Sequence, residues 1–395
     1  METVAFCITL CYNESSRLSK KKRRMRCLMQ VQKVLQVTAG LRQGGAEAMI
    51  MNVYEQIDRT RLQFDFLVYD DTPTHYTERV KELGGNVIVL KRHPSWNALD
   101  YWKKLSRILT EYGPYTAVHA HTNVHNALPL AVAKHCGIQK RISHSHSIKS
   151  YEGYGLLRKA FWGLMGKVIH RTATTFAACG TEAGYSLYGR KLFDDRGVVI
   201  HNPIAIEDYL SQKRADSLQK DCLTIGCVGS FREAKNHAFI VKIAAALKEK
   251  GIPFRMQFAG NGELEPEIRQ MVSDQHLTDQ IMFLGLRRDI PELMAQFDLL
   301  LMPSLYEGFP VTLIESQASG LPALISDRVP AETDLGMGLI DRCALSDSLD
   351  QWVAHIFKTA STETPDADFR RKILLEKGFD TASVVRELYQ LYGVK

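Results

Sequence analysis

One stretch of this chain decides its fold, and it reads Leu299-Leu-Leu-Met-Pro-Ser-Leu-Tyr-Glu307-Gly-Phe-Pro-Val-Thr-Leu-Ile-Glu315-Ser-Gln-Ala-Ser-Gly320-Leu-Pro322. The run from residue 298 to residue 302 predicts a short buried strand. Pro310 suits the first turn of a helix, Gly320 suits its C-terminal end, and Pro322 prevents its continuation. The helix N-terminus then lies beyond the carboxyl end of the strand. In an open α/β sheet a ligand binds there, and a helix N-terminus favours an anion.

Two carboxylates accompany this predicted anion site. Glu307 falls in the turn, and Glu315 falls about a turn and a half along the helix. A carboxylate accepts hydrogen bonds from two hydroxyls at once, so the pair points to sugar rings flanking a phosphate. The alternative is a surface helix with solvated glutamates, and the spacing by itself does not choose between the two.

The composition limits the class of protein. The 395 residues are 45% hydrophobic and 24% charged, as in an ordinary soluble protein. This length predicts two domains, and no run approaches the roughly 18 apolar residues of a membrane span. The formal net charge is +6, yet residues 1–28 alone hold seven Lys and Arg against two acidic residues. The rest is nearly neutral, which argues against a nucleic-acid partner, because such proteins carry their positive charge on the folded domain.

The N-terminal segment, residues 1–28, is expected to be a disordered basic tail without a catalytic role. Its apolar run Val4 to Cys11 precedes the positive charges, which is the wrong order for a secretory signal. The eight cysteines include no C-x-x-C pair and no metal-ligand spacing. We interpret them as reduced thiols of a cytoplasmic protein.

Strand-like runs alternate with helix-length amphipathic runs, which is the pattern of parallel βαβ units. The predicted strands are Lys33–Thr38, Phe64–Tyr69, Asn86–Leu90, Ala117–Ala120, Lys140–Ser145, Thr174–Ala178 and Gly197–His201 in a first sheet, and Leu223–Gly229, Phe254–Ala259, Ile281–Leu284 and Asp298–Met302 in a second. The remaining C-terminal stretch is predicted to be helical, with a closing helix over Phe369–Tyr392. The fold class is therefore α/β, with two doubly wound Rossmann-like domains facing a central cleft.

These patterns divide the chain into four segments. They are the basic tail 1–28, an N-terminal domain 29–205, a C-terminal domain 206–372, and a C-terminal helix 373–395. The last segment is a candidate for packing back on the N-terminal domain.

Three further patterns carry candidate chemistry. The run Gly40-Leu-Arg-Gln-Gly44-Gly45-Ala-Glu47 follows the first strand, so its backbone N–H groups can approach a phosphate; the alternative is a plain strand-to-helix turn. Histidines at 119, 121, 125, 144 and 146 form two groups, each at the carboxyl end of a strand, and would bind a metal or act in acid/base chemistry if they met. A zinc site would need a further carboxylate or thiolate, and no suitable spacing supplies one.

A predicted helix combines Arg158, Lys159, Phe161, Trp162, Leu164 and Lys167, which suits either membrane docking or an ordinary core-facing helix.

The Glu307 and Glu315 spacing resembles the E-x7-E signature of retaining GT-B glycosyltransferases of family 4. The resemblance implies that Glu315 binds the nucleotide ribose and that Glu307 contacts the donor sugar. It also implies that the backbone at Gly308 and Phe309 lies against the diphosphate.

Other segments extend this resemblance over roughly residues 31–395. It implies that Gly45 faces the donor diphosphate and the acceptor, that Asn202 belongs to an interdomain turn, and that Arg287 lines the nucleotide base. His146 matches the histidine that contacts the donor sugar, with His121 at its paired position. We interpret His119 and His144 as structural or surface residues.

The run Gly229-Ser-Phe-Arg232-Glu-Ala-Lys235-Asn resembles the turn in which a basic pair offsets the diphosphate charge. Lys235 matches the family lysine. Ser230 stands where the family has an arginine, and we expect Arg232, two residues further on, to take over that role.

The resemblance implies a retaining glycosyltransferase that moves a hexose from a UDP-sugar to a polyprenyl-linked or oligosaccharide acceptor. Trp352 and the run Pro330-Ala-Glu332 resemble the branch that acts in bacterial capsule and exopolysaccharide synthesis. The expected location is the cytoplasm, with the inner face of the cell membrane as a candidate docking surface. No metal or other cofactor is expected, because the D-x-D run Asp366-Ala-Asp368 falls in a predicted solvated loop. The alternatives are a GT-B phosphorylase and a non-catalytic sugar-nucleotide-binding protein.

Overall fold

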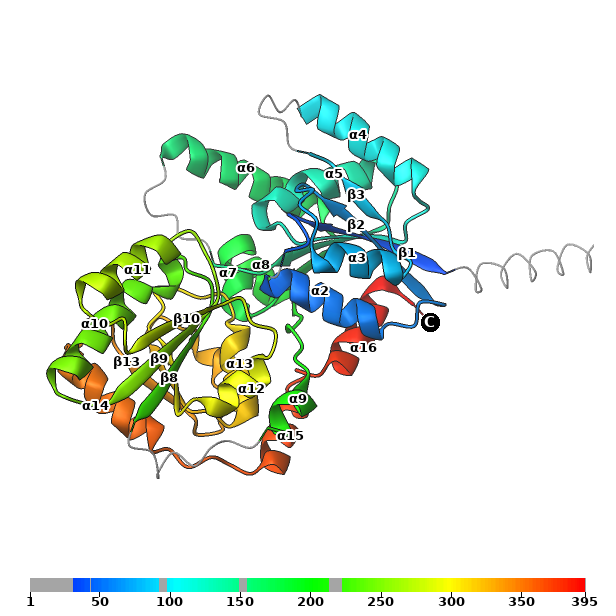
Figure 1. Ribbon diagram of the computed structural model, residues 1–395. Helices are drawn as coiled ribbons and strands as arrows, with labels where there is room; N and C mark the ends of the chain where they lie inside the picture. The colour runs from blue at the N-terminus through cyan, green and yellow to red at the C-terminus, as the bar shows by residue number, and fades with distance from the viewer. Residues whose placement is uncertain (1–30, 43, 92–97, 149–154, 213–221, 395) are drawn as a thin grey trace, which may run out of the picture.

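The computed structural model describes residues 31–42, 44–91, 98–148, 155–212 and 222–394, which form two α/β domains (Figure 1). Each domain holds one parallel sheet with helices packed around it. This architecture confirms the predicted fold class. The predicted basic tail, residues 1–28, lies outside the described residues.

The seven-stranded sheet of the first domain follows the order β3-β2-β1-β4-β5-β6-β7, and each pair is parallel. Its strands are β1 (Gln32–Thr38), β2 (Leu62–Val68), β3 (Val87–Val89), β4 (Ala117–Ala120), β5 (Lys140–Ser145), β6 (Thr175–Ala178) and β7 (Gly197–Val199). Its helices are α2 (Gly45–Gln56), α3 (His75–Glu82), α4 (Ala98–Glu111), α5 (Ala127–His135), α6 (Leu156–Thr172), α7 (Thr181–Tyr188) and α8 (Arg190–Arg196), with the 3₁₀ turn η1 (Asn123–Asn126) after β4. The strand order reverses between β1 and β4, which creates a switch point at their carboxyl ends.

The six-stranded sheet of the second domain follows the order β10-β9-β8-β11-β12-β13. Its strands are β8 (Leu223–Val228), β9 (Phe254–Ala259), β10 (Ile281–Gly285), β11 (Leu299–Met302), β12 (Ala323–Ser326) and β13 (Ile340–Cys343). Around it lie α9 (Ile206–Leu210), η3 (Glu233–Lys235), α10 (His237–Glu249), α11 (Glu265–Asp274), α12 (Ile290–Gln296), α13 (Val311–Ser319), η4 (Ala331–Thr333), α14 (Leu349–Ala360) and α15 (Ala367–Glu376). Its switch point lies between β8 and β11, so the loops after these two strands face the same place.

The strands predicted from the sequence agree with the structure to within two residues at each end. The prediction of only helices after the Glu315 helix is wrong, because β12 and β13 lie there. Each of these strands has four residues, which is too few to show a strand period.

The chain crosses between the domains twice, and the two crossings lie side by side. Ile204 N–H donates to Phe379 O at 2.9 Å, and Ile204 pairs with Asp380 as an isolated bridge. After the return crossing, α16 (Thr381–Tyr392) packs on α2 of the first domain. The single closing helix predicted over Phe369–Tyr392 is wrong, because Gly378 adopts a φ of +74° and the Asp380 side chain caps a new helix.

None of the helices in the described part of the chain has both the length and the hydropathy that crossing a membrane would require.

Candidate active site

The unit of β11 and α13 forms as predicted. All four residues of β11 are buried, Pro310 immediately precedes α13, and Gly320 ends the helix with a φ of +70°. The turn between them touches the other domain: a Cβ on Gly308 would lie 2.9 Å from the Cα of Ser147. Glycine is therefore required where this turn meets the loop after β5.

Lys235 and Glu307 form an ion pair at this turn. The Lys235 Nζ lies 2.7 Å from the Glu307 Oε1, and their side chains are 19% and 11% exposed. Ser304 donates its hydroxyl to the same carboxylate oxygen at 2.7 Å. The loops are also joined through their backbones, because Leu305 N–H donates to Ala234 O at 2.8 Å. The switch point of the second domain thus holds a fixed, largely buried pair of opposite charges.

The loop after β8 carries this lysine and packs tightly on a second glycine turn. A Cβ on Gly260 or Gly262 would collide with the backbone of Gly229 or Phe231 respectively, so neither position accepts a side chain. The methylene groups of Lys235 lie against Gly229, where a Cβ would be 3.1 Å from Lys235 Cε. These contacts fix the path of the lysine from its backbone to its ammonium group.

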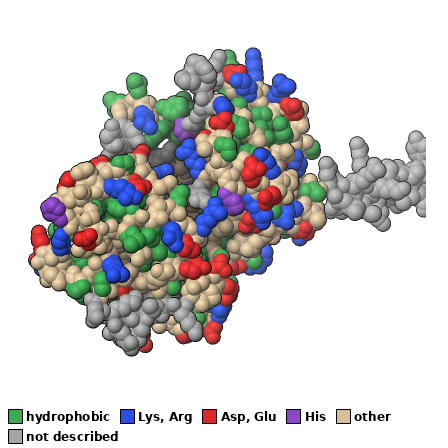
Figure 2. All heavy atoms as spheres, in the orientation of Figure 1, with side chains coloured by type: hydrophobic (Ala, Val, Ile, Leu, Met, Phe, Trp, Pro, Cys, Tyr) green, Lys and Arg blue, Asp and Glu red, His purple; other side chains and the backbone are tan. Residues whose placement is uncertain are grey.

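Arg232 is exposed on the same loop and acts across the domain junction. Burial raises the pKa of the Glu47 carboxyl on α2, and a hydrogen bond from Thr38 and the positive charge of Arg232 oppose that rise. The Thr38 hydroxyl lies 3.1 Å from Glu47 Oε1. A hollow separates the two lobes on one face of the molecule, with Lys and Arg side chains at its margin (Figure 2).

Glu315 lies half-buried on α13 and faces α9. Its carboxylate accepts a hydrogen bond from the buried hydroxyl of Tyr209, and burial raises its pKa. Burial and the nearby Glu315 charge also raise the pKa of Tyr209. A single tyrosine hydroxyl leaves most of the acceptor capacity of a carboxylate unused, which is the arrangement that binding a diol requires.

Three other predicted residues lie where the domains meet. Asn202 is buried beside the start of α2, and its amide nitrogen is the atom nearest to a Cβ built on Gly45. Phe309 is buried against His201 and Phe379, with ring centroids 5.3 and 5.8 Å away. These rings pack the two crossings against the turn that follows Glu307.

Four of the five histidines predicted at the carboxyl ends of β4 and β5 come together. His121 Nδ1 lies 2.8 Å from His146 Nε2, and His119 Nε2 lies 3.1 Å from His144 Nδ1. His119 and His144 are fully buried, so the alternative that they lie on the surface is wrong. Burial lowers the pKa of His146 to about 3 and lowers those of the other three well below the usual range. The cluster is therefore neutral at physiological pH.

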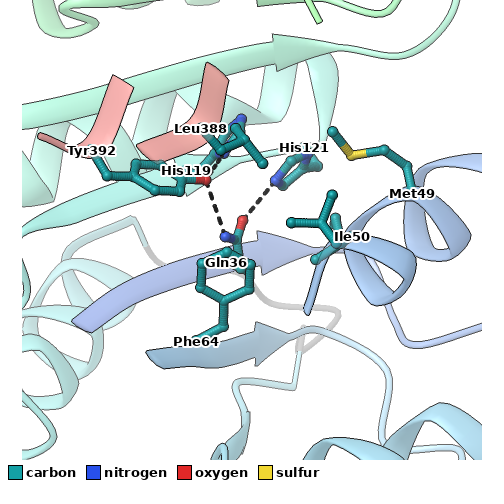
Figure 3. Close-up of a pocket in the computed structure, with 9 residues that line it drawn as sticks. Gln36, Met49, Ile50, Phe64, His119, His121, Leu388 and Tyr392 are labelled. Carbon is teal, nitrogen blue, oxygen red and sulfur yellow. Dashed lines mark hydrogen bonds between the residues drawn. The ribbon is translucent and has the colours of Figure 1, made fainter. Parts of the chain in front are cut away.

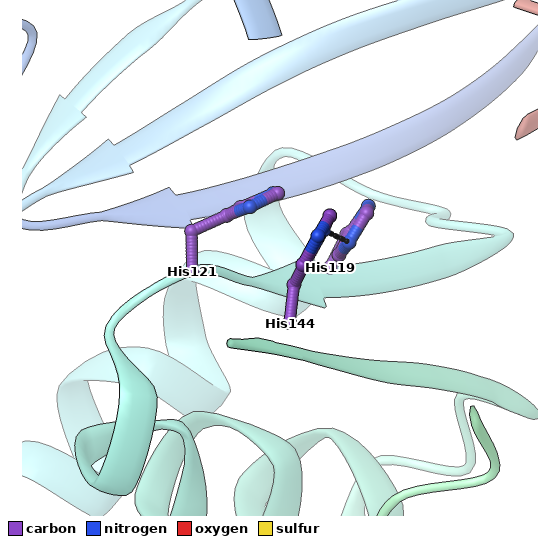
Figure 4. A group of neighbouring side chains, drawn as sticks. All are labelled: His119, His121 and His144. Atoms are coloured by element: carbon purple, nitrogen blue, oxygen red, sulfur yellow. Dashed lines mark hydrogen bonds between the residues drawn. The ribbon is translucent and has the colours of Figure 1, made fainter. Parts of the chain in front are cut away.

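Three of these rings also form a candidate metal site. The ring nitrogens that His119, His121 and His144 can offer lie within 4.8 Å of one another (Figure 4). Tetrahedral zinc with bonds of about 2.1 Å would need them about 3.4 Å apart. The short nitrogen pairs are those between His119 and His144 and between His121 and His146, and hydrogen bonds between neutral rings explain them.

Arg287 and the D-x-D run are tied to local partners. Arg287 Nε donates to Asp289 Oδ1 at 2.8 Å, at the carboxyl end of β10. Asp366 caps α15 by accepting from Phe369 N–H at 2.8 Å, and Asp368 lies in the first turn of that helix. The predicted solvated loop at Asp368 is therefore wrong.

Two residues that shape the site were not assigned to it from the sequence. Asn123 has a φ of +54°, and its side-chain oxygen accepts from His146 N–H at 3.1 Å, which fixes the loop after β5. Glu332 caps a helix of the other domain, with Thr181 N–H donating to its Oε2 at 3.0 Å. An asparagine after a strand is a signal for a left-handed residue, whereas a cap supplied by another domain has no local pattern.

Comparison with known proteins supports the same fold and activity. The family model Glycosyl transferase 4-like domain matches residues 44–203, and the family model Glycosyl transferases group 1 matches residues 210–335. The Putative glycosyltransferase EpsF of Bacillus subtilis (strain 168) is 36% identical over 370 residues, which cover 92% of this chain and 96% of that protein.

A more distant sequence and a solved structure are also similar. The UDP-Gal:alpha-D-GlcNAc-diphosphoundecaprenol alpha-1,3-galactosyltransferase of Escherichia coli is 24% identical over 54% of this chain and 58% of its own length. The crystal structure of Anabaena Alr3699/HepE in complex with UDP and glucose is 17% identical, covers 92% of this chain and 100% of that chain, and has a TM-score of 0.72. Since the two family models match both domains, and the EpsF likeness is close over nearly the whole length, this chain belongs to the GT-B glycosyltransferases.

Proposed function

We propose that the protein transfers a hexose, with retention of the anomeric configuration, from a UDP-sugar to a polyprenyl-linked or saccharide acceptor in surface polysaccharide synthesis. One observation carries the proposal: the Lys235–Glu307 ion pair lies at the switch point of the second sheet, in the turn before the helix α13 that carries Glu315. Around this one turn, Lys235 would face the diphosphate, Glu307 the sugar and Glu315 the two hydroxyls of the ribose.

The proposed chemistry breaks the bond between the anomeric carbon and the diphosphate oxygen. Positive charge grows on the sugar while negative charge grows on the leaving diphosphate. The Lys235 ammonium group stabilises the negative charge, and Arg232 adds a second cation from the same loop. Because the ion pair with Glu307 holds Lys235 in place before the reaction, its stabilisation of the charge costs little reorganisation at the moment of bond breaking.

The relatives support the donor and acceptor classes. The Escherichia coli enzyme is named for a UDP-sugar and a diphosphoundecaprenol acceptor, and the Anabaena structure is titled as a complex with UDP and glucose. The test is release of free UDP from a panel of UDP-sugars with a polyprenyl-diphosphate sugar as the acceptor. NMR of the product reports the anomeric configuration.

Two results of that assay would contradict the proposal. Formation of a sugar 1-phosphate only when inorganic phosphate is added would show a phosphorylase. Thermal stabilisation by UDP-sugars without release of UDP from any donor and acceptor pair would show a binding protein.

We further propose that the reaction needs no divalent metal, because protein cations lie where the diphosphate charge must be offset. UDP release should be unchanged in excess EDTA. Loss of activity in EDTA that Mg²⁺ or Mn²⁺ restores would overturn this part of the proposal.

A lipid-linked acceptor requires a membrane surface, and α6 supplies a suitable face. Leu156 and Leu157 at its start are 85% and 90% exposed, and Phe161 and Leu164 follow on the surface. The Arg158 guanidinium lies 5.4 Å from the centre of the Trp162 ring. Figure 2 shows hydrophobic and basic side chains together over this projecting helix. Exposed apolar residues flanked by cations favour an anionic lipid surface.

Co-sedimentation with anionic vesicles tests this face in protein that begins at Met29, so that the basic tail does not contribute. Neutralising Arg158, Lys159 and Lys167 together should lower the bound fraction. Neutralising Lys242, Lys248 and Lys250 on and after α10 is the matched control and should leave it unchanged. Equal binding by both triple variants and the wild type would contradict membrane docking by α6.

A further inference from the structure

A chain of hydrogen bonds runs from the last helix to His146. Tyr392 on α16 receives a hydrogen bond from Gln36 Nε2 at 3.3 Å, and Gln36 Oε1 lies 2.9 Å from His121 Nε2. His121 Nδ1 then lies 2.8 Å from His146 Nε2. Figure 3 shows Gln36 on β1 reaching both Tyr392 and His121. Tyr392, Gln36 and His121 are buried, each with an exposed fraction of 6% or less.

The protons along this chain are fixed by the amide. An amide oxygen only accepts, so His121 Nε2 must carry a proton and donate it to Gln36. Because a neutral imidazole has one N–H, His121 Nδ1 is then an acceptor. His146 must therefore donate from Nε2, which leaves its Nδ1 without a proton. Burial keeps the rings neutral by lowering the pKa of each histidine.

The unprotonated His146 Nδ1 has no hydrogen-bond partner among the described residues. It is a buried nitrogen, and it belongs to the loop that meets the Gly308 turn of the second domain. A buried acceptor without a partner is costly, so such an atom marks a place for a ligand. The Gly308 turn carries the ion pair at which we place the donor sugar.

We propose that Gln36, held by Tyr392, is a positioning residue that sets His146 in the Nε2–H form, so that its bare Nδ1 accepts a hydrogen bond from a hydroxyl of the donor sugar. This inference rests on the proposed function for the identity of the ligand. It selects a donor with a neutral hydroxyl facing His146. A hexuronic acid whose carboxylate faced His146 would be rejected, because two acceptors would then face each other.

The amide orientation is the element that decides between two states. If the Gln36 amide were turned over, its NH₂ would donate to His121 Nε2 and every proton along the chain would move to the opposite nitrogen. His146 would then present Nδ1–H, which binds a carboxylate or carbonyl instead of a hydroxyl proton. The Tyr392 hydroxyl also lies 2.6 Å from His119 Nδ1. If it donates there, it is left to accept from Gln36, which favours the first state.

The experiment reads the ring protons directly in the free, full-length protein. Histidine is labelled with ¹⁵N, and two-bond ¹H–¹⁵N correlations distinguish an Nε2–H ring from an Nδ1–H ring. Loss of one set of signals in His146→Gln assigns the ring. The wild type should show His146 as Nε2–H, and an Nδ1–H ring would overturn the proposal.

Two variants and a matched control test the cause. Gln36→Glu places a carboxylate against His121, which should draw a second proton onto that ring and shift the His146 proton to Nδ1. Tyr392→Phe removes the partner of the amide nitrogen and should give a mixture of both forms. Tyr188→Phe loses a buried hydroxyl that bonds Ser143 and Ala177 in the same domain, and should leave His146 unchanged. Unchanged His146 signals in both Gln36→Glu and Tyr392→Phe would overturn the assigned role.

Donor kinetics separate this inference from the proposed function. Gln36→Glu should lower kcat/KM for the UDP-hexose about ten- to a hundredfold, as expected for one unsatisfied buried hydrogen bond, while Tyr188→Phe stays near the wild type. If His146 has the expected form but no UDP-sugar is turned over, the proposed function fails and the proton arrangement stands. If turnover is normal and the ring is Nδ1–H, the arrangement fails and the function stands. One equivalent of bound zinc, copper or nickel in the purified protein would also overturn it, because a metal would then join the ring nitrogens.

Discussion

The two domains meet at one junction with opposite kinds of polar residue. The first domain offers neutral imidazoles at 119, 121, 144 and 146, whose pKa values burial lowers. The second domain offers charged groups, with the Lys235–Glu307 pair at 2.7 Å and the carboxylate of Glu315 on α13. The first set is stabilised by hydrogen bonds between rings, and the second by Coulomb attraction.

The difference matches what each domain would contact in the proposed reaction. Charge develops mainly on the diphosphate, and fixed charges act strongly in a site shielded from water. The sugar hydroxyls carry no net charge, and neutral acceptors recognise them without attracting stray ions. The following predictions test this contrast, beginning with the largest expected effect.

The neutral histidines should make folding sensitive to acid. A buried histidine stays neutral in the folded state, whereas the unfolded chain takes up a proton below about pH 6.5. Their contribution to the free energy of unfolding is thus complete above about pH 6.5. It is lost as the pH falls towards the pKa in the folded state, which is about 3 for His146. Four such groups lower the free energy of unfolding by up to about 5 kcal/mol per pH unit. Urea unfolding between pH 7.5 and 5 measures this slope.

Burial raises the pKa values of Glu47 and Glu315, which acts in the opposite direction and reduces the observed slope somewhat. His144→Gln should also reduce the slope, whereas the exposed His135→Gln should not. A free energy of unfolding that did not change between pH 6.5 and 5 would show that the cluster takes up protons without unfolding.

The second prediction concerns the charged pair. Lys235→Ala removes the ammonium group aimed at the developing diphosphate charge, and kcat should fall about 10²- to 10³-fold, or about 2.7–4 kcal/mol. Lys242→Ala, an exposed lysine on α10, is the control. A higher donor KM with an unchanged kcat would mean that Lys235 binds the ground state and the transition state equally.

The third prediction concerns Glu315. Replacing it with alanine removes charge-assisted hydrogen bonds worth about 1.5–3 kcal/mol, so the donor KM should rise about ten- to a hundredfold. Tyr209→Phe, which removes only the hydroxyl facing the carboxylate, should have a smaller effect. Glu267→Ala on the exposed side of α11 serves as the control. Unchanged donor binding in Glu315→Ala would remove this residue from the ribose site.

The smallest expected effect belongs to Arg232. Its side chain is exposed, and solvent screens its charge, so Arg232→Ala should lower kcat about tenfold, less than Lys235→Ala. A double-mutant cycle with Glu47→Gln measures the coupling across the junction, because Arg232 acts on the pKa of that carboxyl. An effect equal to that of Lys235→Ala would show that closure of the domains brings the guanidinium onto the diphosphate.

The strand and helix pattern shows how much of this structure is local. β4, β5 and β9 were predictable to the residue, since each is short and bounded by turns. The Glu307 turn was predictable for the same reason, because Pro310 and Gly320 act on their own neighbours. The break between α15 and α16 was missed, although Gly378 and Asp380 carry the ordinary signals for ending one helix and beginning another.

The sequence by itself determined the two α/β domains, the glycine turns after β1 and β8, and the two carboxylates of α13 and its turn. Such features depend on residues within a few positions of one another. Only the tertiary structure decided that Lys235 pairs with Glu307, 72 residues away by number, and that Tyr392 reaches His121 through Gln36. It also decided that Glu332 caps a helix of the other domain. These contacts join residues whose strands and helices meet only after the sheets have formed, and no local periodicity records which side chains will face each other across a folded junction.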